Sequence, residues 1–227
     1  MSGLLNSTIG RKYAMALSAI FLLVFLVMHL SLNLLSVFSE KAFNQGSYFM
    51  GYNPLIQFVM QPILLIGVIF HFVMGFVLEI KNRNARPVKY AVNGAAANST
   101  WMSRNMIVSG AVVLAFLGLH LYDFWLHEIT YKYVQGRVDS PETMRFWIEL
   151  NEKFYGDYIR VAIYVVANVL LGLHLAHGFQ SSFQSIGARH PKYSSCIAGF
   201  GKLYSIIIPL GFIIVAVYHL VSTSSLF

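Results

Sequence analysis

The chain has 227 residues, of which 57% are hydrophobic and only 11% charged, whereas soluble domains carry about 25% charged residues. Its charged residues cluster between apolar runs long enough to cross a bilayer, so the sequence predicts an integral membrane protein. The net charge of +7 belongs to the loops that flank these runs, and we expect no binding of nucleic acid from it. A single cysteine, Cys196, excludes an iron–sulfur cluster, which takes about four thiolates. No Cys-x-x-Cys-His motif is present, so any haem is expected to be held without covalent attachment.

Five apolar runs are predicted to form transmembrane helices, because each is near the roughly 20 residues that cross the hydrocarbon layer. The first run exceeds the ~7–15 apolar residues of a signal peptide and is expected to be retained. The predicted fold class is therefore all-α, a single integral membrane domain over residues 1–227. In chain order the predicted helices are Tyr13–Phe38, Leu55–Leu78, Asn105–Leu126, Tyr158–Phe183 and Leu203–Val221.

Basic residues predict the orientation of this bundle. Ten Lys and Arg residues fall in segments that share a side with the N-terminus, and six fall on the other side. The excess favours a cytoplasmic N-terminus. On the outer side, Ser140-Pro141-Glu142 is typical of a helix start. It predicts a short interfacial helix with Met144, Trp147, Ile148 and Phe154 on one face.

One histidine lies in each of the first four runs: His29, His71, His120 and His174. Ionisable residues are costly in the hydrocarbon core, and histidine readily ligates iron. At 1.5 Å per residue, His29 and His120 lie roughly 24 and 22 Å from the inner ends of their helices. His71 and His174 lie roughly 11 and 14 Å from theirs. We therefore expect an outer pair, His29 with His120, and an inner pair, His71 with His174, with centres on the order of 10 Å apart in depth.

Each pair is predicted to hold one haem b through its iron. Glycine one turn after a histidine, at Gly75 and Gly178, removes bulk on the ligand's face, although small residues also serve plain helix packing. Other readings remain open: hydrogen-bonded structural histidines, or a polar lining for a proton or metal pathway. His177 is the main rival of His174. His127 and His219, near the outer interface, suit structural or quinone-facing roles, and His190 is expected to be solvated.

These residues resemble the di-haem, five-helix cytochrome b membrane anchor of succinate dehydrogenase and fumarate reductase, over essentially the whole chain. The resemblance rests on one ligand in each of the first four helices. It also rests on His29-Leu-Ser-Leu-Asn-Leu-Leu, His71-x-x-x-Gly75 and His120-Leu-Tyr. In that family the fourth ligand precedes a helix-ending glycine by thirteen residues. The distance from His174 to Gly187 is the same, which favours His174 over His177.

The resemblance implies a subunit of a succinate:quinone oxidoreductase in a bacterial cytoplasmic membrane, with no catalytic residue of its own. Its partners would be a flavoprotein with covalent FAD, an iron–sulfur subunit, membrane lipid and a quinone, usually menaquinone, on the outer side. Electrons would pass from the iron–sulfur clusters to the inner haem, the outer haem and quinone. Candidate proton groups near the quinone are Glu40, Asp123 and His127, and candidate partners of the haem propionates are Lys12, Trp101 and Arg104.

One position departs from part of this family. Some fumarate reductases carry a glutamate two residues before the fourth ligand and use it to move protons, and here that position is Gly172. This favours succinate dehydrogenase over fumarate reductase as the complex to which the chain belongs. Both directions of electron flow remain open from the sequence. Rival classes are the di-haem cytochromes b of hydrogenase, formate dehydrogenase or nitrate reductase, a haem-free transporter lined by histidines, and a structural anchor whose haems are dispensable.

Overall fold

The computed structural model describes residues 7–84, 105–188 and 190–222, and every regular element in these ranges is helical. Five helical stretches are long and apolar enough to cross a membrane. Apolar side chains such as Val24, Ile66, Val166 and Ile206 are exposed on their outer faces, as expected of surfaces in contact with lipid. The five stretches are Thr8–Phe38, Ile56–Asn84, Met106–Val134, Tyr158–Ser185 and Pro191–Val221.

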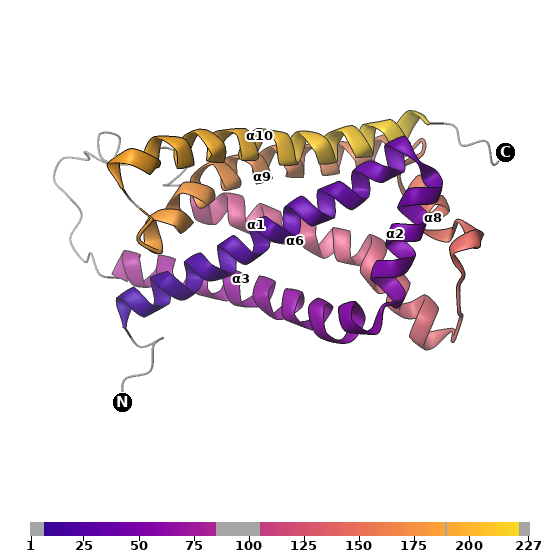
Figure 1. The fold of residues 1–227 in the computed structure, drawn as a ribbon, viewed down its shortest axis with the longest axis horizontal. Helices are drawn as coiled ribbons and strands as arrows, with labels where there is room; N and C mark the ends of the chain where they lie inside the picture. Colours follow the sequence, from indigo (N-terminus) through magenta and orange to yellow (C-terminus); the bar gives the residue numbers. More distant parts are fainter. Residues whose placement is uncertain (1–6, 85–104, 189, 223–227) are drawn as a thin grey trace.

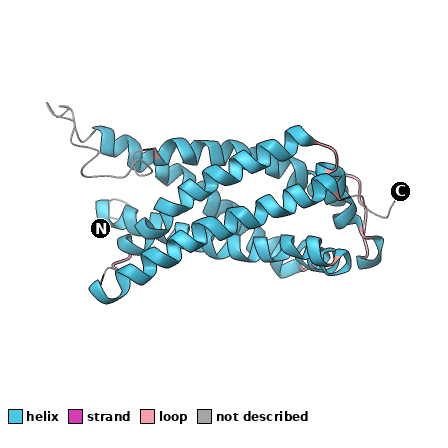
Figure 2. Ribbon diagram, turned by 90° about the horizontal axis from the view of Figure 1, so that it is seen from above, coloured by secondary structure: helices cyan, strands magenta, loops and turns pink. Residues whose placement is uncertain are grey.

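The helices form an elongated bundle (Figures 1 and 2). Helix α1 runs diagonally and contacts α3, α9 and α10, while α9 packs against α6 and α10 (Figure 1). The start of α1 and the end of α10 lie at opposite ends of the bundle (Figure 1). The main helices are α1 (Thr8–Phe38), α2 (Glu40–Tyr52), α3 (Gln61–Asn84), α6 (Met106–His120), α8 (Arg145–Phe154), α9 (Tyr158–Ser185) and α10 (Pro191–Val221).

Two of these helices are extended by π-helical turns. A π-helical segment, Ile56–Met60, leads into α3. Beyond α6 the helical path continues through a π-helical turn (Leu121–Trp125), α7 (Leu126–Ile129) and a second π-helical turn (Thr130–Val134). Such turns insert an extra residue into the helix and often accompany functional sites. The turn Leu121–Trp125 directly follows His120.

The helices begin earlier or end later than the apolar runs predict, because capped polar turns extend them beyond the hydrocarbon. Helix α1 begins at Thr8, where the Ser7 hydroxyl accepts a hydrogen bond from the Gly10 amide at 2.8 Å. Helix α10 begins at Pro191 rather than Leu203. There the His190 Nδ1 accepts from the Lys192 amide at 3.1 Å. His190 therefore caps a helix and is not merely a solvated loop residue.

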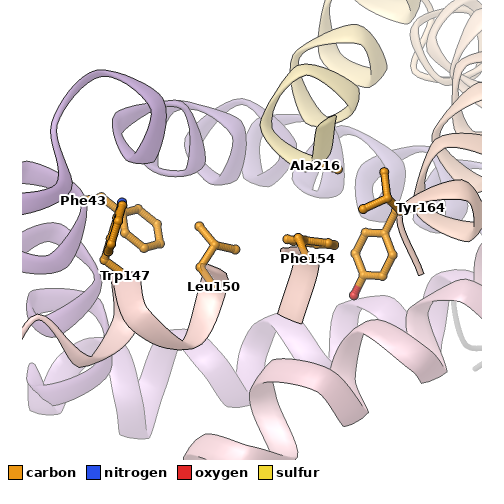
Figure 3. Packing of buried hydrophobic residues seen from close by; sticks show 7 residues of the cluster. Phe43, Trp147, Leu150, Phe154, Tyr164 and Ala216 are labelled. Carbon is orange, nitrogen blue, oxygen red and sulfur yellow. The ribbon is translucent and has the colours of Figure 1, made fainter. Parts of the chain in front are cut away.

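Helices α2 and α8 lie together at one end of the bundle (Figure 1). In Figure 3, Trp147, Leu150 and Phe154 of α8 point into a shared cluster, with Phe43 of α2 beside Trp147. The remaining buried members of this cluster are Val161, Tyr164 and Ala216. Its packing ties both short helices to α9 and α10, so this end of the bundle is closed by an apolar core.

The predicted start of α8 needs correction, whereas the four residues predicted to share one face, Met144, Trp147, Ile148 and Phe154, all pack against this cluster. The Ser140-Pro141-Glu142 signal begins a 3-10 turn, Pro141–Thr143, and α8 itself begins only at Arg145. Met144 separates the two with a left-handed backbone, φ 55°. Trp147 and Phe154 are buried as expected. The buried face also contains Leu150 and Asn151, so it is broader than the sequence predicts.

His219 is fully buried where α10 meets α1 and α8. Its Nδ1 lies 2.9 Å from Asn151 Oδ1, and its Nε2 lies 2.8 Å from Ser36 Oγ. The Ser36 hydroxyl also donates to the Asn33 carbonyl at 2.6 Å. Both ring nitrogens therefore have partners within the protein. Of the two roles left open by the sequence, this position favours the structural one.

Candidate functional site

The outer pair of histidines meets between α1 and α6. The ring centroids of His29 and His120 lie 5.7 Å apart, and the ring planes are inclined by 82°. Phe25 stacks on His29 with centroids 5.2 Å apart, and Phe116 stacks on His120 at 6.0 Å. Both imidazoles are half-buried. The outer pair thus consists of two adjacent, nearly perpendicular imidazoles with aromatic neighbours.

The inner pair meets between α3 and α9. The ring centroids of His71 and His174 lie 6.5 Å apart, with an interplanar angle of 72°. Both rings are half-buried. The histidine beside His71 is therefore His174, which the family spacing favours over His177.

Each inner histidine also contacts a serine that the sequence reasoning did not identify. Ser18 Oγ on α1 lies 3.1 Å from His71 Nδ1 and donates to the Met15 carbonyl at 2.8 Å. On α6, Ser109 Oγ lies 3.2 Å from His174 Nδ1 and donates at 2.9 Å to the carbonyl three residues before it. The same arrangement occurs on two different helices.

A repeated sequence signal accompanies these contacts. Met15-x-x-Ser18 precedes His29 by the same spacing with which Met106-x-x-Ser109 precedes His120, eleven residues from serine to histidine. Eleven residues of helix span about 16 Å. Helices α1 and α6 therefore each contribute a serine to the inner layer and a histidine to the outer layer. The serine and the histidine of each helix are separated by about 16 Å along the helix axis.

The glycines one turn after the inner histidines face methionine side chains. A Cβ atom at Gly75 would lie 3.6 Å from the Met15 methyl, and one at Gly178 would lie 3.4 Å from the Met106 methyl. Both distances are ordinary van der Waals contacts, so the packing of these helices does not itself require glycine at either position. By contrast, a Cβ at Gly118, two residues before His120, would meet nothing within 4 Å.

The two histidine pairs suit a metal that takes only two ligands from the protein and the others from a cofactor. Within the described ranges, no group of three or more His, Cys, Asp and Glu side chains is placed to hold a metal ion. A zinc ion takes about four ligands, whereas haem iron needs only axial ligands from the protein. Two imidazoles on opposite sides of a metal, each bonded at about 2 Å, have ring centroids about 6 Å apart. Both histidine pairs have separations near that value. In addition, His120 Nδ1 is buried without a hydrogen-bond partner among the described residues.

Asp123 is the only one of the candidate proton groups that is fully buried. It forms an ion pair with Arg160 of α9 and accepts a hydrogen bond from the Tyr164 hydroxyl at 2.9 Å. The Tyr164 ring lies edge-on to His120, with centroids 6.3 Å apart. Arg160 Nε also contacts Asp157 at 3.1 Å. Asp123 therefore has protein partners that link the π-helical turn after α6 to the start of α9, beside His120.

The other candidates are placed differently. Glu40 is exposed in the first turn of α2, just after its capping residue Ser39. Lys12 is exposed on α1. His127 Nε2 lies 3.4 Å from Glu149, at the edge of a polar cavity. The candidate partners Trp101 and Arg104 fall outside the described residues.

This polar cavity, about 530 Å³ in volume, opens beside α8. Arg145 lies at its wall and bonds three carboxylates, Glu128 at 2.6 Å, Asp139 at 2.5 Å and Glu149 at 2.6 Å. Burial by itself lowers the pKa of the guanidinium, but the three carboxylates outweigh it and raise that pKa above its ordinary value. Arg145 is therefore charged at any physiological pH. Its ion pairs connect the loop before α8 to α7.

Asp139 gives this network a dependence on pH. Burial alone would raise the pKa of Asp139, but hydrogen bonds from Thr143 and Arg145 outweigh it and hold the pKa below the ordinary value. A lowered pKa stabilises the folded loop above the unfolded pKa of about 4, and the contribution disappears as pH falls through the lowered value. We expect hydrogen-exchange protection factors over residues 135–145 to be constant from pH 8 to 5 and to fall below about pH 4. Asp139→Asn should lower them already at pH 7. Protection unchanged down to pH 2 would contradict this prediction.

Gly172 is a point of close approach between α9 and α10. A Cβ atom there would lie 3.0 Å from the Ser205 carbonyl oxygen and 3.4 Å from Pro209 Cγ. Pro209 lies inside α10 and has no N–H to offer that carbonyl. The space beside Gly172 is therefore filled by the neighbouring helix.

We expect Gly172→Ala to destabilise the bundle by about 1–3 kcal/mol through overpacking, and Gly172→Glu to do so more strongly. Chemical denaturation of the detergent-solubilised protein measures the change. Gly199→Ala is the matched control, because a Cβ at that position would meet nothing within 4 Å, and alanine there should be neutral or stabilising. Equal effects at the two glycines would show that the α9–α10 contact is not tight.

No protein-family profile, curated protein or solved structure matches this chain.

Proposed function

We propose that this chain is the membrane anchor and electron-transfer subunit of a succinate:menaquinone oxidoreductase, holding two haems b. The observation that carries the proposal is the arrangement of four transmembrane histidines as two facing pairs, one at each of two levels of the bundle. His29 and His120 would be the axial ligands of the outer haem, and His71 and His174 those of the inner haem. When bound, each haem supplies reversible one-electron chemistry.

The residues fit this role better than that of a haem-free channel. Each histidine pair comes from two facing helices, and the separations of 5.7 and 6.5 Å suit coordination of one metal between the rings. The one acid in the described part of the bundle that is fully buried, Asp123, has an arginine and a tyrosine as partners. It does not line an open polar path.

The end of the bundle where α1 begins would face the cytoplasm and dock the iron–sulfur subunit, with the flavoprotein and its FAD beyond it. Helix α3 ends and α10 begins at this same end (Figure 1). Lys81 and Arg83 lie in the last turn of α3 and Lys192 in the first turn of α10, and the proposed orientation rests on the excess of basic residues in the full sequence. The membrane would then be a bacterial cytoplasmic membrane.

Menaquinone would react at the opposite end, near the outer pair. Of the candidate proton groups there, His127 borders the outer polar cavity, whereas Asp123 is held by Arg160 and Tyr164. We therefore assign proton delivery to His127 first. Gly172 leaves no room for a glutamate-based proton route, and this favours succinate oxidation over the alternative, fumarate reduction by quinol.

The proposal is tested by isolating the tagged chain in mild detergent from the membranes of cells that naturally make it. We expect a flavoprotein and an iron–sulfur subunit to copurify, and succinate to reduce the b-type haem absorption of the complex. Adding a menaquinone analogue should reoxidise it. A haem-containing chain that copurifies with a hydrogenase, or whose haems do not respond to succinate, would contradict the assignment.

A further inference from the structure

We propose that Ser18 and Ser109 are positioning residues that fix the tautomer of the two inner histidines and thereby tune the reduction potential of the inner haem. This inference rests on the proposed function, since it assigns to His71 and His174 the ligation of iron. It adds two residues on α1 and α6 to a layer whose ligands lie on α3 and α9.

The argument begins with the proton of the serine hydroxyl. A hydroxyl has one hydrogen to donate, and Ser18 donates it to the Met15 carbonyl at 2.8 Å. Toward His71 Nδ1, 3.1 Å away, the same oxygen is therefore an acceptor. Nδ1 must then carry the ring proton. A neutral imidazole has a single N–H, so the lone pair is on Nε2, the atom available to a metal.

The second inner histidine is held in the same way. Ser109 donates its hydroxyl proton to the Met106 carbonyl at 2.9 Å and accepts from His174 Nδ1 at 3.2 Å. Its Nε2 is therefore also unprotonated. The same hydrogen-bond arrangement therefore occurs at both inner histidines, from serines on two different helices. It leaves Nε2 of each ring available to the same metal.

Among the described residues, no serine hydroxyl contacts Nδ1 of either histidine of the outer pair. The group near His29 Nδ1 is the amide nitrogen of Asn33, a donor, which lies 3.5 Å from Nδ1 and 2.8 Å from the His29 carbonyl oxygen. His120 Nδ1 has no hydrogen-bond partner within the described part of the chain. A serine substitution at the inner layer should therefore change one haem and leave the other unchanged.

A hydrogen bond from Nδ1–H makes an imidazole a stronger electron donor and stabilises the oxidised metal. Removing the acceptor should therefore raise the reduction potential of the inner haem. Groups that hydrogen-bond a metal-binding histidine in this way change metal affinity or activity by about 10–100-fold when removed. We expect a more modest change of about three- to tenfold in the oxidation equilibrium, which is roughly 30–60 mV for a one-electron couple.

The experiment is a spectroelectrochemical titration of the purified full chain, or of its complex, carrying Ser18→Ala, Ser109→Ala or both. We expect one of two haem potentials to rise in each variant, with a larger rise in the double variant. Ser31→Ala is the matched control, because Ser31 lies exposed on α1 and donates to the Val27 carbonyl at 2.8 Å. Ser18→Thr and Ser109→Thr retain the hydroxyl and should restore the original potential.

The outcomes separate this inference from the proposed function. Two haems with unchanged potentials in the alanine variants would overturn the serine assignment and leave the di-haem proposal standing. If alanine variants lose one haem while threonine variants keep it, the positioning role is supported. If Ser31→Ala has the same effect, the change is a general response of the bundle and the inference is wrong. Absence of haem from the unsubstituted protein would overturn the proposed function itself.

Discussion

Replacing His71 with alanine is expected to remove one of two b-type haems, and replacing His174 is expected to remove the same one. The two ring centroids lie 6.5 Å apart, so in the proposed site loss of either ring would leave only one histidine to hold the haem. His29→Ala and His120→Ala should remove the other haem, because their rings form the outer pair. Pyridine haemochrome quantitation and reduced-minus-oxidised spectra measure the haem content of each variant.

His177→Ala is the matched control for these substitutions. His177 is half-buried, lies one turn from His174 on α9 and belongs to neither facing pair. This variant should retain both haems. If His174→Ala kept both haems while His177→Ala lost one, the inner ligand would be His177 and the inner pairing would be wrong.

Replacing Arg160 with methionine is expected to be strongly destabilising, by about 3–5 kcal/mol. Asp123 is 1% exposed, so loss of Arg160 leaves a buried carboxylate with only the Tyr164 hydroxyl as a partner. Denaturation of the detergent-solubilised protein, followed by its helical circular dichroism, measures the loss. The double variant Asp123→Leu/Arg160→Met should regain part of it, because replacing both ions removes the unpaired charge.

Arg83→Met is the control for this second prediction. Arg83 Nε pairs with Glu79 at 2.6 Å, but its side chain is 70% exposed, and exposed ion pairs contribute at most about 1 kcal/mol. A similar loss of stability in both variants would contradict the view that the ion pair of Asp123 and Arg160 holds the π-helical turn after α6 to the start of α9.

The parts of the structure that sequence predicts best are those fixed by a single helix. Hydropathy over about 20 residues locates a transmembrane helix, and all five predicted helices are present. A constant rise per residue converts position into depth, and the rings that depth pairs do lie beside each other. Their role as haem ligands remains a prediction.

Features made by contacts between helices are less visible in the sequence. Arg160 lies 37 residues after Asp123, and no local pattern shows that one neutralises the other. Serine in a membrane helix commonly bonds a carbonyl of its own helix, so Ser18 and Ser109 carry no individual signal. The available signal was the equal spacing from each serine to the histidine eleven residues later.

The ends of the helices are also poorly predicted by hydropathy. Hydropathy registers the hydrocarbon layer only, whereas a helix continues until its terminal amides and carbonyls find other partners. The Ser7 hydroxyl and the His190 ring supply such partners at α1 and α10. The left-handed Met144 delays the start of α8. These ends depend on single side-chain contacts, which residue composition does not reveal.

The measurement that tests the central proposal most directly is the haem content of the purified, unsubstituted chain, made in cells able to supply haem. Pyridine haemochrome quantitation should give two b-type haems per chain, both reducible by dithionite. Protein that is folded but free of haem would contradict the di-haem proposal and would favour a haem-free protein lined by histidines.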